Sequence, residues 1–147
     1  MAWGADQCSG GTAYSSGDQG SWVAARAFDD NPSSTSSQTW ASPDPATDPW
    51  LAYNFTSAKV IRRSRVQCYQ DNSHAPSEIK IYGSNDSTDG SDGSWDLLHT
   101  ESAISFSGDN TWIDFNWSNS TSYTWIKWEI SDFDDEGSSY TAVQELE

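Results

Sequence analysis

Positive charge is scarce in this chain of 147 residues, which carries seven Lys and Arg residues against 22 Asp and Glu residues. The formal net charge is −15 at pH 7. Such a charge repels phosphate backbones and anionic lipid headgroups, so we expect neither a nucleic acid nor an anionic membrane as partner. Long apolar runs are missing as well, and no stretch approaches the ~20 consecutive apolar residues of a membrane-spanning helix.

Cysteine is also rare, with Cys8 and Cys68 as the two thiols of the chain. Two cysteines cannot form a zinc site without histidine, and His74 and His99 stand away from both in the sequence. We therefore expect no Cys/His metal site. The pattern around Cys68 places its side chain inward from a strand, which favours a buried free thiol; a disulfide to Cys8 is the alternative.

Apolar residues make up 35% of the chain, a low share that is concentrated in nine Trp, six Tyr and five Phe. Disordered acidic chains lack such rings, so we expect a folded single domain over residues 1–147. Apolar residues alternate with polar ones, which is typical of half-buried strands, and turn-forming residues separate these stretches. The pattern predicts an all-β antiparallel sandwich, with one short helix at 21–28. The alternating stretches are 51–55, 79–81, 113–117 and 126–130.

Two features lie outside this core pattern. Trp125 has outward parity in its strand, and an exposed tryptophan there would cover a sheet edge or bind a partner. Four of the seven cations fall in one run, and we interpret this run as a charged strand that discourages pairing at a sheet edge. The run consists of Lys59, Arg62, Arg63 and Arg65.

Several short motifs, taken in order, carry a resemblance to a known family. The sequence reads AFDDNP at 27–32, TWAS at 39–42, PWL at 49–51, AP at 75–76, IKIYGSND at 79–86, WDLL at 95–98 and VQEL at 143–146. This order resembles the discoidin family, which includes coagulation-factor C-type domains and family 32 carbohydrate-binding modules. The resemblance implies an eight-stranded antiparallel jelly-roll β-sandwich whose loops gather at one end. It also implies that Trp40, Trp50 and Trp95 are core residues.

Many members of that family hold a structural calcium ion, and the resemblance implies a ligand set for it here. Ca²⁺ takes ~6–8 oxygen ligands, so main-chain carbonyls together with two carboxylates suit it. The alternative is an ordinary Asx turn at 29–31 without a metal. The stretch 33–38 is longer than the family spacing, which leaves open whether Ser34 or Thr35 supplies the hydroxyl. The implied ligands are the carbonyls of Arg26, Asn31 and Gln144, the carboxylates of Asp29 and Glu145, and Ser34.

Sugar-binding members of the family hold their ligand in the loops at one end of the sandwich. A ring stacks on the apolar face of a sugar while planar polar groups bind its hydroxyls. His74 has an alternative interpretation as a surface turn residue. The sequence lacks the loop arginine that galactose-binding relatives often use. The candidate ligand-binding residues are Asp30, Asp44, Asp48, Tyr69, Gln70, Asp71, Asn72, His74 and Phe133.

No catalytic motif is present: the sequence contains no Gly-x-Ser-x-Gly elbow, no His-Glu-x-x-His helix and no phosphate-binding loop. We therefore expect a non-catalytic, extracellular or surface-exposed module that binds glycans as a monomer. The alternative is an adhesion or structural domain, such as a viral tail or cell-surface head, that contacts a protein or host partner. Glycan binding with and without calcium would separate the two.

Overall fold

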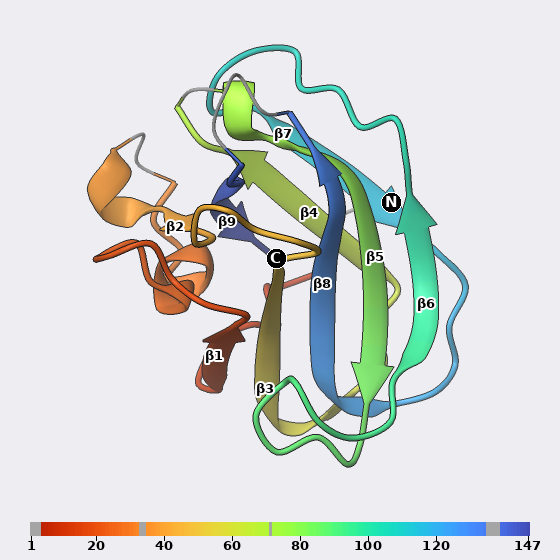
Figure 1. Cartoon of the computed structure of the whole chain (residues 1–147). Helices are drawn as coiled ribbons and strands as arrows, with labels where there is room; N and C mark the ends of the chain where they lie inside the picture. The colour runs from red at the N-terminus through yellow and green to blue at the C-terminus, as the bar shows by residue number, and fades with distance from the viewer. Residues whose placement is uncertain (1–3, 33–34, 71, 135–138) are drawn as a thin grey trace.

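The computed structural model describes residues 4–32, 35–70, 72–134 and 139–147, which form two antiparallel β-sheets packed face to face (Figure 1). The five-stranded sheet has the order β1-β3-β8-β5-β6, and the four-stranded sheet the order β2-β9-β4-β7. The strands of the first sheet are β1 (Thr12–Ser15), β3 (Trp50–Lys59), β8 (Tyr123–Phe133), β5 (Pro76–Ser84) and β6 (Asp96–Glu101). Those of the second are β2 (Trp40–Ala41), β9 (Ala142–Leu146), β4 (Arg63–Cys68) and β7 (Trp112–Asn116).

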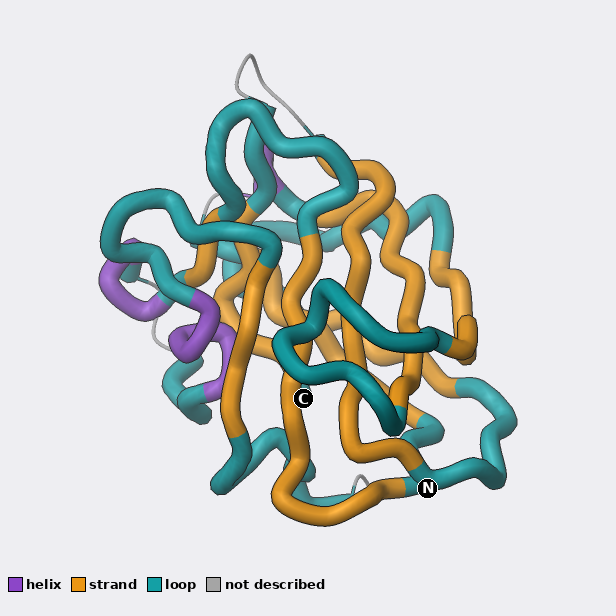
Figure 2. Tube along the Cα trace, turned by 60° about the horizontal axis from the view of Figure 1, so that its bottom comes forward, coloured by secondary structure: helices purple, strands orange, loops and turns teal. Residues whose placement is uncertain are grey.

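This arrangement confirms the predicted all-β jelly-roll class, with nine strands rather than eight among the described residues. The expected helix at 21–28 is shorter and tighter than an α-helix: it is the 3₁₀-helix η1 (Ala24–Phe28). Two further 3₁₀-helices are η2 (Ser36–Gln38) and η3 (Asn72–His74). Figure 2 shows η1 and η2 together on one flank of the sandwich. None of the helices in the described part of the chain is long and apolar enough to cross a membrane.

The core lies between the sheets and follows the alternation predicted from the sequence. Ile126, Trp128 and Ile130 point inward from the long central strand β8 and are at most 2% exposed. The indole N–H of Trp128 donates to Ser64 Oγ at 2.9 Å, which satisfies its one polar group inside the core. Cys68 is a buried free thiol, as predicted, and Cys8 is buried and free as well.

The outer face of the five-stranded sheet corrects three expectations about tryptophan. Trp50 and Trp95 are half-buried outside the core, because both rings surround the ammonium of Lys127. The Lys127 Nζ atom lies 3.9 Å from the Trp95 ring centroid and 5.6 Å from that of Trp50. Trp125 does point outward, but it is only 3% exposed because the ring of Tyr14 packs over it at 5.0 Å.

The long loop between β5 and β6, residues 85–95, folds back over this outer face. Gly90 has a φ of +88°, and a Cβ atom there would lie 2.9 Å from the Trp50 ring, so the close approach requires glycine. The main-chain carbonyl of Gly90 accepts a hydrogen bond from Lys127 at 3.3 Å. Burial lowers the pKa of Lys127. The loop and the rings of Trp50, Tyr82 and Trp95, all of which lie near the Lys127 ammonium, therefore form a small second layer outside the sheet.

Carboxylates hold this loop in shape, so its order should depend on pH. Asp92 accepts hydrogen bonds from the Thr88 hydroxyl and N–H, both at 2.6 Å, and these bonds lower the pKa of its carboxyl. The pKa of Asp86 and that of Asp89 are lowered too. A carboxyl whose pKa falls on folding stabilises the fold above its ordinary pKa of 3.8, and this stabilisation is lost as the pH falls further.

We therefore expect the amides of residues 87–94 to lose protection from hydrogen exchange between about pH 4 and pH 2, before the core strands open. Asp92→Ala should produce a several-fold loss of protection in the same amides at neutral pH. Asp132→Ala, which removes an exposed aspartate at the other end of the sandwich, serves as the control. Protection of this loop that is unchanged in Asp92→Ala would contradict the prediction.

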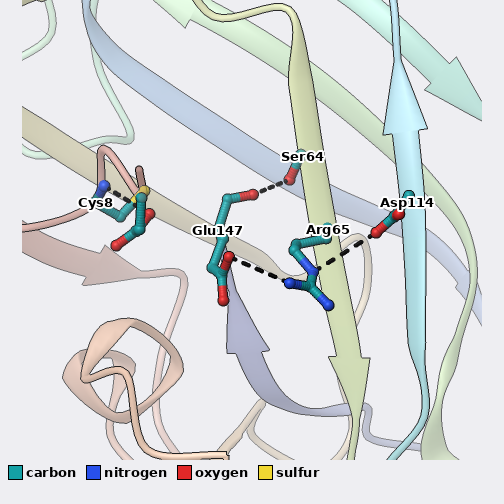
Figure 3. Close-up of polar contacts among 6 residues, drawn as sticks. Cys8, Ser64, Arg65, Asp114 and Glu147 are labelled. Atoms are coloured by element: carbon teal, nitrogen blue, oxygen red, sulfur yellow. Dashed lines mark hydrogen bonds and ion pairs between the residues drawn. The ribbon is translucent and has the colours of Figure 1, made fainter. Parts of the chain in front are cut away.

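The basic run does not lie at a sheet edge, and that expectation is wrong. Strand β4 pairs with β9 on one side and with β7 on the other, so it is an interior strand. Its outward side chains include Arg65, which lies between Asp114 and Glu147 in Figure 3. The N–O distances are 3.6 Å to Asp114 and 3.7 Å to Glu147. Arg65 is therefore neutralised by neighbouring carboxylates on its own sheet.

Candidate calcium centre and ligand-binding loops

The turn that follows η1 meets the last strand, β9, and joins two acidic side chains that are far apart in the sequence. The main-chain N–H of Asn31 donates to Asp29 Oδ1 at 3.0 Å and to Glu145 Oε2 at 3.2 Å. Both carboxylates thus lie against one amide. Asp29 is exposed, whereas Glu145 is 1% exposed beneath the turn.

The electrostatic surroundings of Glu145 disfavour its charge. Burial, followed by the nearby Asp29 carboxylate, raises the pKa of Glu145 to about 8. The N–H groups of Asp30 and Asn31 oppose this shift only in part. Partial burial also raises the pKa of Asp29, although the guanidinium of Arg26 acts in the other direction. Within the described residues, the charges that act on Glu145 are those of Asp29 and Asp30, both negative.

Gln144 connects this turn to the chain that follows it. Its side-chain Nε2 donates to the main-chain carbonyls of Gln38 at 2.7 Å and Asn31 at 3.3 Å, while its Oε1 accepts from the Thr39 hydroxyl at 2.8 Å. The sequence had suggested only its main-chain carbonyl as a ligand. Arg26 is tied in the same way, because its guanidinium donates to the Ser37 carbonyl. The turn is therefore fixed by side chains on both of its flanks.

These residues fit a calcium ion in the chemistry of their donors. A buried carboxylate beside a second one carries negative charge that a divalent cation would neutralise, and Asn31 adds a carbonyl oxygen with a second lone pair. No group of three or more His, Cys, Asp or Glu side chains that could hold a metal ion by themselves occurs in the described ranges. Main-chain oxygens would have to complete the shell. Ser34, the suggested hydroxyl ligand, lies outside the described residues.

The second candidate region is the end of the sandwich at which β5 and β9 begin and β4 and β8 end. Loops from distant parts of the chain are tied together there by hydrogen bonds. The Ala46 N–H donates to the Ser139 carbonyl at 2.7 Å, and the Thr141 hydroxyl donates to the His74 carbonyl at 2.8 Å. A third link runs from the Gln19 N–H to the Ala41 carbonyl at 2.9 Å.

Aromatic rings from these loops pack in pairs. The imidazole of His74 stacks on the ring of Tyr140, with centroids 4.2 Å apart and planes at 25°. Tyr69 packs against Trp22 at 5.5 Å and is itself buried. Three of these side chains, those of His74, Tyr140 and Trp22, are half-buried and so keep part of their surface in solvent. Trp22 and Tyr140 were not among the predicted ligand contacts, since only the fold brings them beside Tyr69 and His74.

Comparisons with solved structures identify the architecture, although no family model and no curated protein matches the sequence. A chitosan-binding module 2 from a chitosanase/glucanase of Paenibacillus sp. IK-5, solved with chitotriose, aligns with a TM-score of 0.76 at 18% identity over 97% of this chain and 98% of its own. A family 32 module of Clostridium perfringens NanJ, solved with galactose, aligns with a TM-score of 0.73 at 17% identity over 95% and 93%.

The chain has the discoidin-like jelly-roll fold of family 32 carbohydrate-binding modules. A third module of this fold, CBM32-3 from a family 31 glycoside hydrolase of C. perfringens, aligns with a TM-score of 0.77 at 14% identity over 95% of this chain and 90% of its own. At these identities the likeness establishes the fold and not the ligand.

Within this fold, most of the predicted ligand contacts lie at the loop end. Asp44 and Asp48 are exposed between β2 and β3, and Gln70 donates from its amide to the Tyr69 hydroxyl at 2.8 Å. The N–H of Asn72 donates to Asp109 Oδ1 at 3.2 Å, which links η3 to the loop before β7. Asp71 lies outside the described residues.

Two predicted contacts are placed differently. Phe133 is half-buried at the end of β8 and packs against the main core, so much of its ring is committed to packing. Asp30 does not lie with the other loop residues. It sits beside Asp29 on the flank of the sandwich, where it lines a hollow with Gly11 and Tyr53. Asp30 therefore belongs to the acidic turn rather than to the loop end.

Proposed function

We propose that the protein is a non-catalytic carbohydrate-binding module that holds a sugar against the loop end of its sandwich. The observation that carries this proposal is the stacked pair of His74 and Tyr140, half-exposed among polar loop residues. A flat ring of this kind offers a surface for the C–H face of a pyranose, and neighbouring amides and carboxylates suit its hydroxyls. The shared fold with modules solved in complex with sugars supports the same conclusion.

The negative charge of the loop end favours neutral sugars and amino sugars as ligands over acidic sugars. Its exposed residues include several aspartates, and the loops 16–23, 42–49, 69–75, 102–111 and 134–141 contain no Lys or Arg. A carboxylate or sulfate on the ligand would meet like charge there, whereas the ammonium of an amino sugar would be attracted. Chitotriose, the ligand of one structural neighbour, is a sugar of the second kind.

A calcium ion at Asp29 and Glu145 is the structural part of the proposal. Bound there, it would neutralise the buried Glu145 carboxylate and clamp the turn after η1 onto β9. It lies on the flank rather than at the loop end, so we expect it to stabilise the module without touching the sugar. A calcium-dependent fold is consistent with the extracellular setting that we expect for a glycan-binding module.

Removal of the stacked pair should abolish most sugar binding. We expect Tyr140→Ala, and separately His74→Ala, to weaken binding of chitotriose or of a galactose oligosaccharide by about tenfold or more, which corresponds to ~1.4 kcal/mol. Isothermal titration calorimetry on the intact chain measures this. Tyr14→Ala is the matched control, since it removes a tyrosine from the outer sheet face and should leave the affinity unchanged.

A broad glycan array probes the proposal as a whole. Binding to one class of neutral or amino sugar, kept in the presence of a chelator as long as the protein stays folded, supports it. An array without any binding, together with a stable oligomer in solution, would instead favour the adhesion or structural alternative.

A further inference from the structure

The basic run has no role in the edge of its sheet, because β4 is paired on both sides. Two of its cations instead line a surface groove. Arg62 and Arg63 line a groove of about 470 Å³ together with Asn116 and Trp117 from the neighbouring strand β7 and the residue after it. Since Arg63 opens β4 and Asn116 closes β7, this groove lies at the end of the sandwich opposite the ligand-binding loops.

Hydrogen bonds hold the two walls of the groove in a fixed relation. The N–H of Trp117 donates to the Arg62 carbonyl at 2.9 Å. The Arg62 Nε donates to the Asn119 carbonyl at 2.7 Å, and Asn119 Nδ2 donates to the Ile61 carbonyl at 3.0 Å. The bond from Arg62 engages one of the five N–H donors of its guanidinium. The arginine and the tryptophan are thus positioned together before any ligand arrives.

Arg62 is not neutralised by neighbouring carboxylates in the way that Arg65 is. Arg65 is paired with two carboxylates (Figure 3). It also lies 4.0 Å above the Trp112 ring. Arg62 is exposed and forms no ion pair with any described residue. Trp117 is half-buried and packs partly against the main core, and its ring stacks at 5.5 Å and 13° on His99, which keeps the indole in one orientation. The part of Trp117 that lines the groove remains open to a ligand.

We propose that this groove binds a sugar unit that carries one carboxylate, such as a terminal uronic acid. A guanidinium binds a carboxylate through paired N–H donors, and an indole packs on the C–H face of a pyranose ring. The net charge of −15 opposes a polyanion, which must bring many charges close to the acidic surface. A single carboxylate meets the guanidinium of Arg62 at short range, while salt screens its repulsion from acidic groups more than ~8–10 Å away.

The experiment uses three probes: methyl β-D-glucuronide, methyl β-D-glucoside and sodium acetate. Binding of each is measured by ¹H–¹⁵N NMR on the full chain. We expect the glucuronide, at millimolar concentration, to shift the Arg62 Nε–H signal and the amide signals of residues 116–119. The glucoside should leave these signals in place, and acetate should need a concentration several-fold higher. Signals from Tyr69 and His74 report on sugar binding at the loop end. A failure of the proposed function is therefore seen separately from a failure of the groove to bind the glucuronide.

Arg62→Gln should weaken glucuronide binding by about fivefold or more, which is the loss expected for one charged hydrogen-bonding partner. Lys80→Gln removes the same charge from the five-stranded sheet and should leave the affinity unchanged. Equal shifts with glucoside or acetate would overturn the proposal, as would an equal loss of affinity in the two variants. Unchanged amide signals outside the groove establish that Arg62→Gln is folded.

Discussion

Chelation of calcium is expected to destabilise the protein strongly. A ligand that binds only the folded state stabilises it by about 4 kcal/mol when its concentration is a thousand times its dissociation constant. The physical reason here is the buried Glu145 carboxylate, which is 1% exposed and has Asp29 and Asp30 as its charged neighbours. Urea unfolding in millimolar calcium and in EDTA, at the same ionic strength, measures the difference.

Glu145→Gln separates the metal from the general effect of salt. It should remove the response to calcium, because the neutral amide no longer attracts the ion. In EDTA at neutral pH the same variant should be at least as stable as the wild type. The amide is neutral already, whereas the Glu145 carboxyl, whose pKa rises to about 8 in the folded chain, must take up a proton on folding. Glu129→Gln, on the outer face of the other sheet, should respond to calcium as the wild type does. Identical unfolding curves with and without calcium would refute the metal site.

Strand alternation predicted much of the core because it depends only on neighbouring residues. Ile126, Trp128 and Ile130 share one face of β8, and a strand with a polar opposite face must bury that face. The same logic placed Trp125 outward correctly but could not foresee its burial. Its cover, the ring of Tyr14, comes from β1, a strand that the alternation did not reveal.

The positions of Trp50 and Trp95 could not be predicted from the sequence for a different reason. Both were expected in the core on the basis of resemblance, and both instead enclose Lys127 under the loop at 85–95. Parity assigns a residue to a face of the sheet, but whether a loop covers that face depends on its path in three dimensions. A lysine among aromatic rings is also a cation–π arrangement, which hydrophobic patterning does not register.

The candidate sites also differ in how far the sequence could predict them. The motif order suggested Asp29 and Glu145, and the structure brings both against the Asn31 amide. The stacked pair of His74 and Tyr140 joins two loops far apart in the sequence, and no local pattern connects them. The groove at Arg62 was hidden for a further reason, because a basic run beside a strand is most simply explained as a charged edge.

Trp128→Ala is expected to cause the other large loss, about 3–5 kcal/mol of unfolding free energy. Trp128 is 2% exposed, packs at 5.6 Å against the ring of Phe28, and donates its indole N–H to Ser64 in the core. Alanine would leave a cavity between the sheets and remove the hydrogen bond that Ser64 Oγ accepts, although this hydroxyl still donates to the Glu147 carbonyl at 2.8 Å. Trp128→Phe should retain most of the packing and cost about 1–3 kcal/mol, through the lost hydrogen bond and the smaller ring.

Trp112→Ala is the matched control, because it makes the same substitution on the outer face of the four-stranded sheet. Trp112 is half-buried and contacts Arg65 through its ring, so we expect a loss of about 1 kcal/mol or less. Urea midpoints should be read by far-UV circular dichroism, since every one of these variants removes a fluorescent tryptophan. Similar losses for Trp128→Ala and Trp112→Ala would mean that burial between the sheets does not decide the stability of this sandwich.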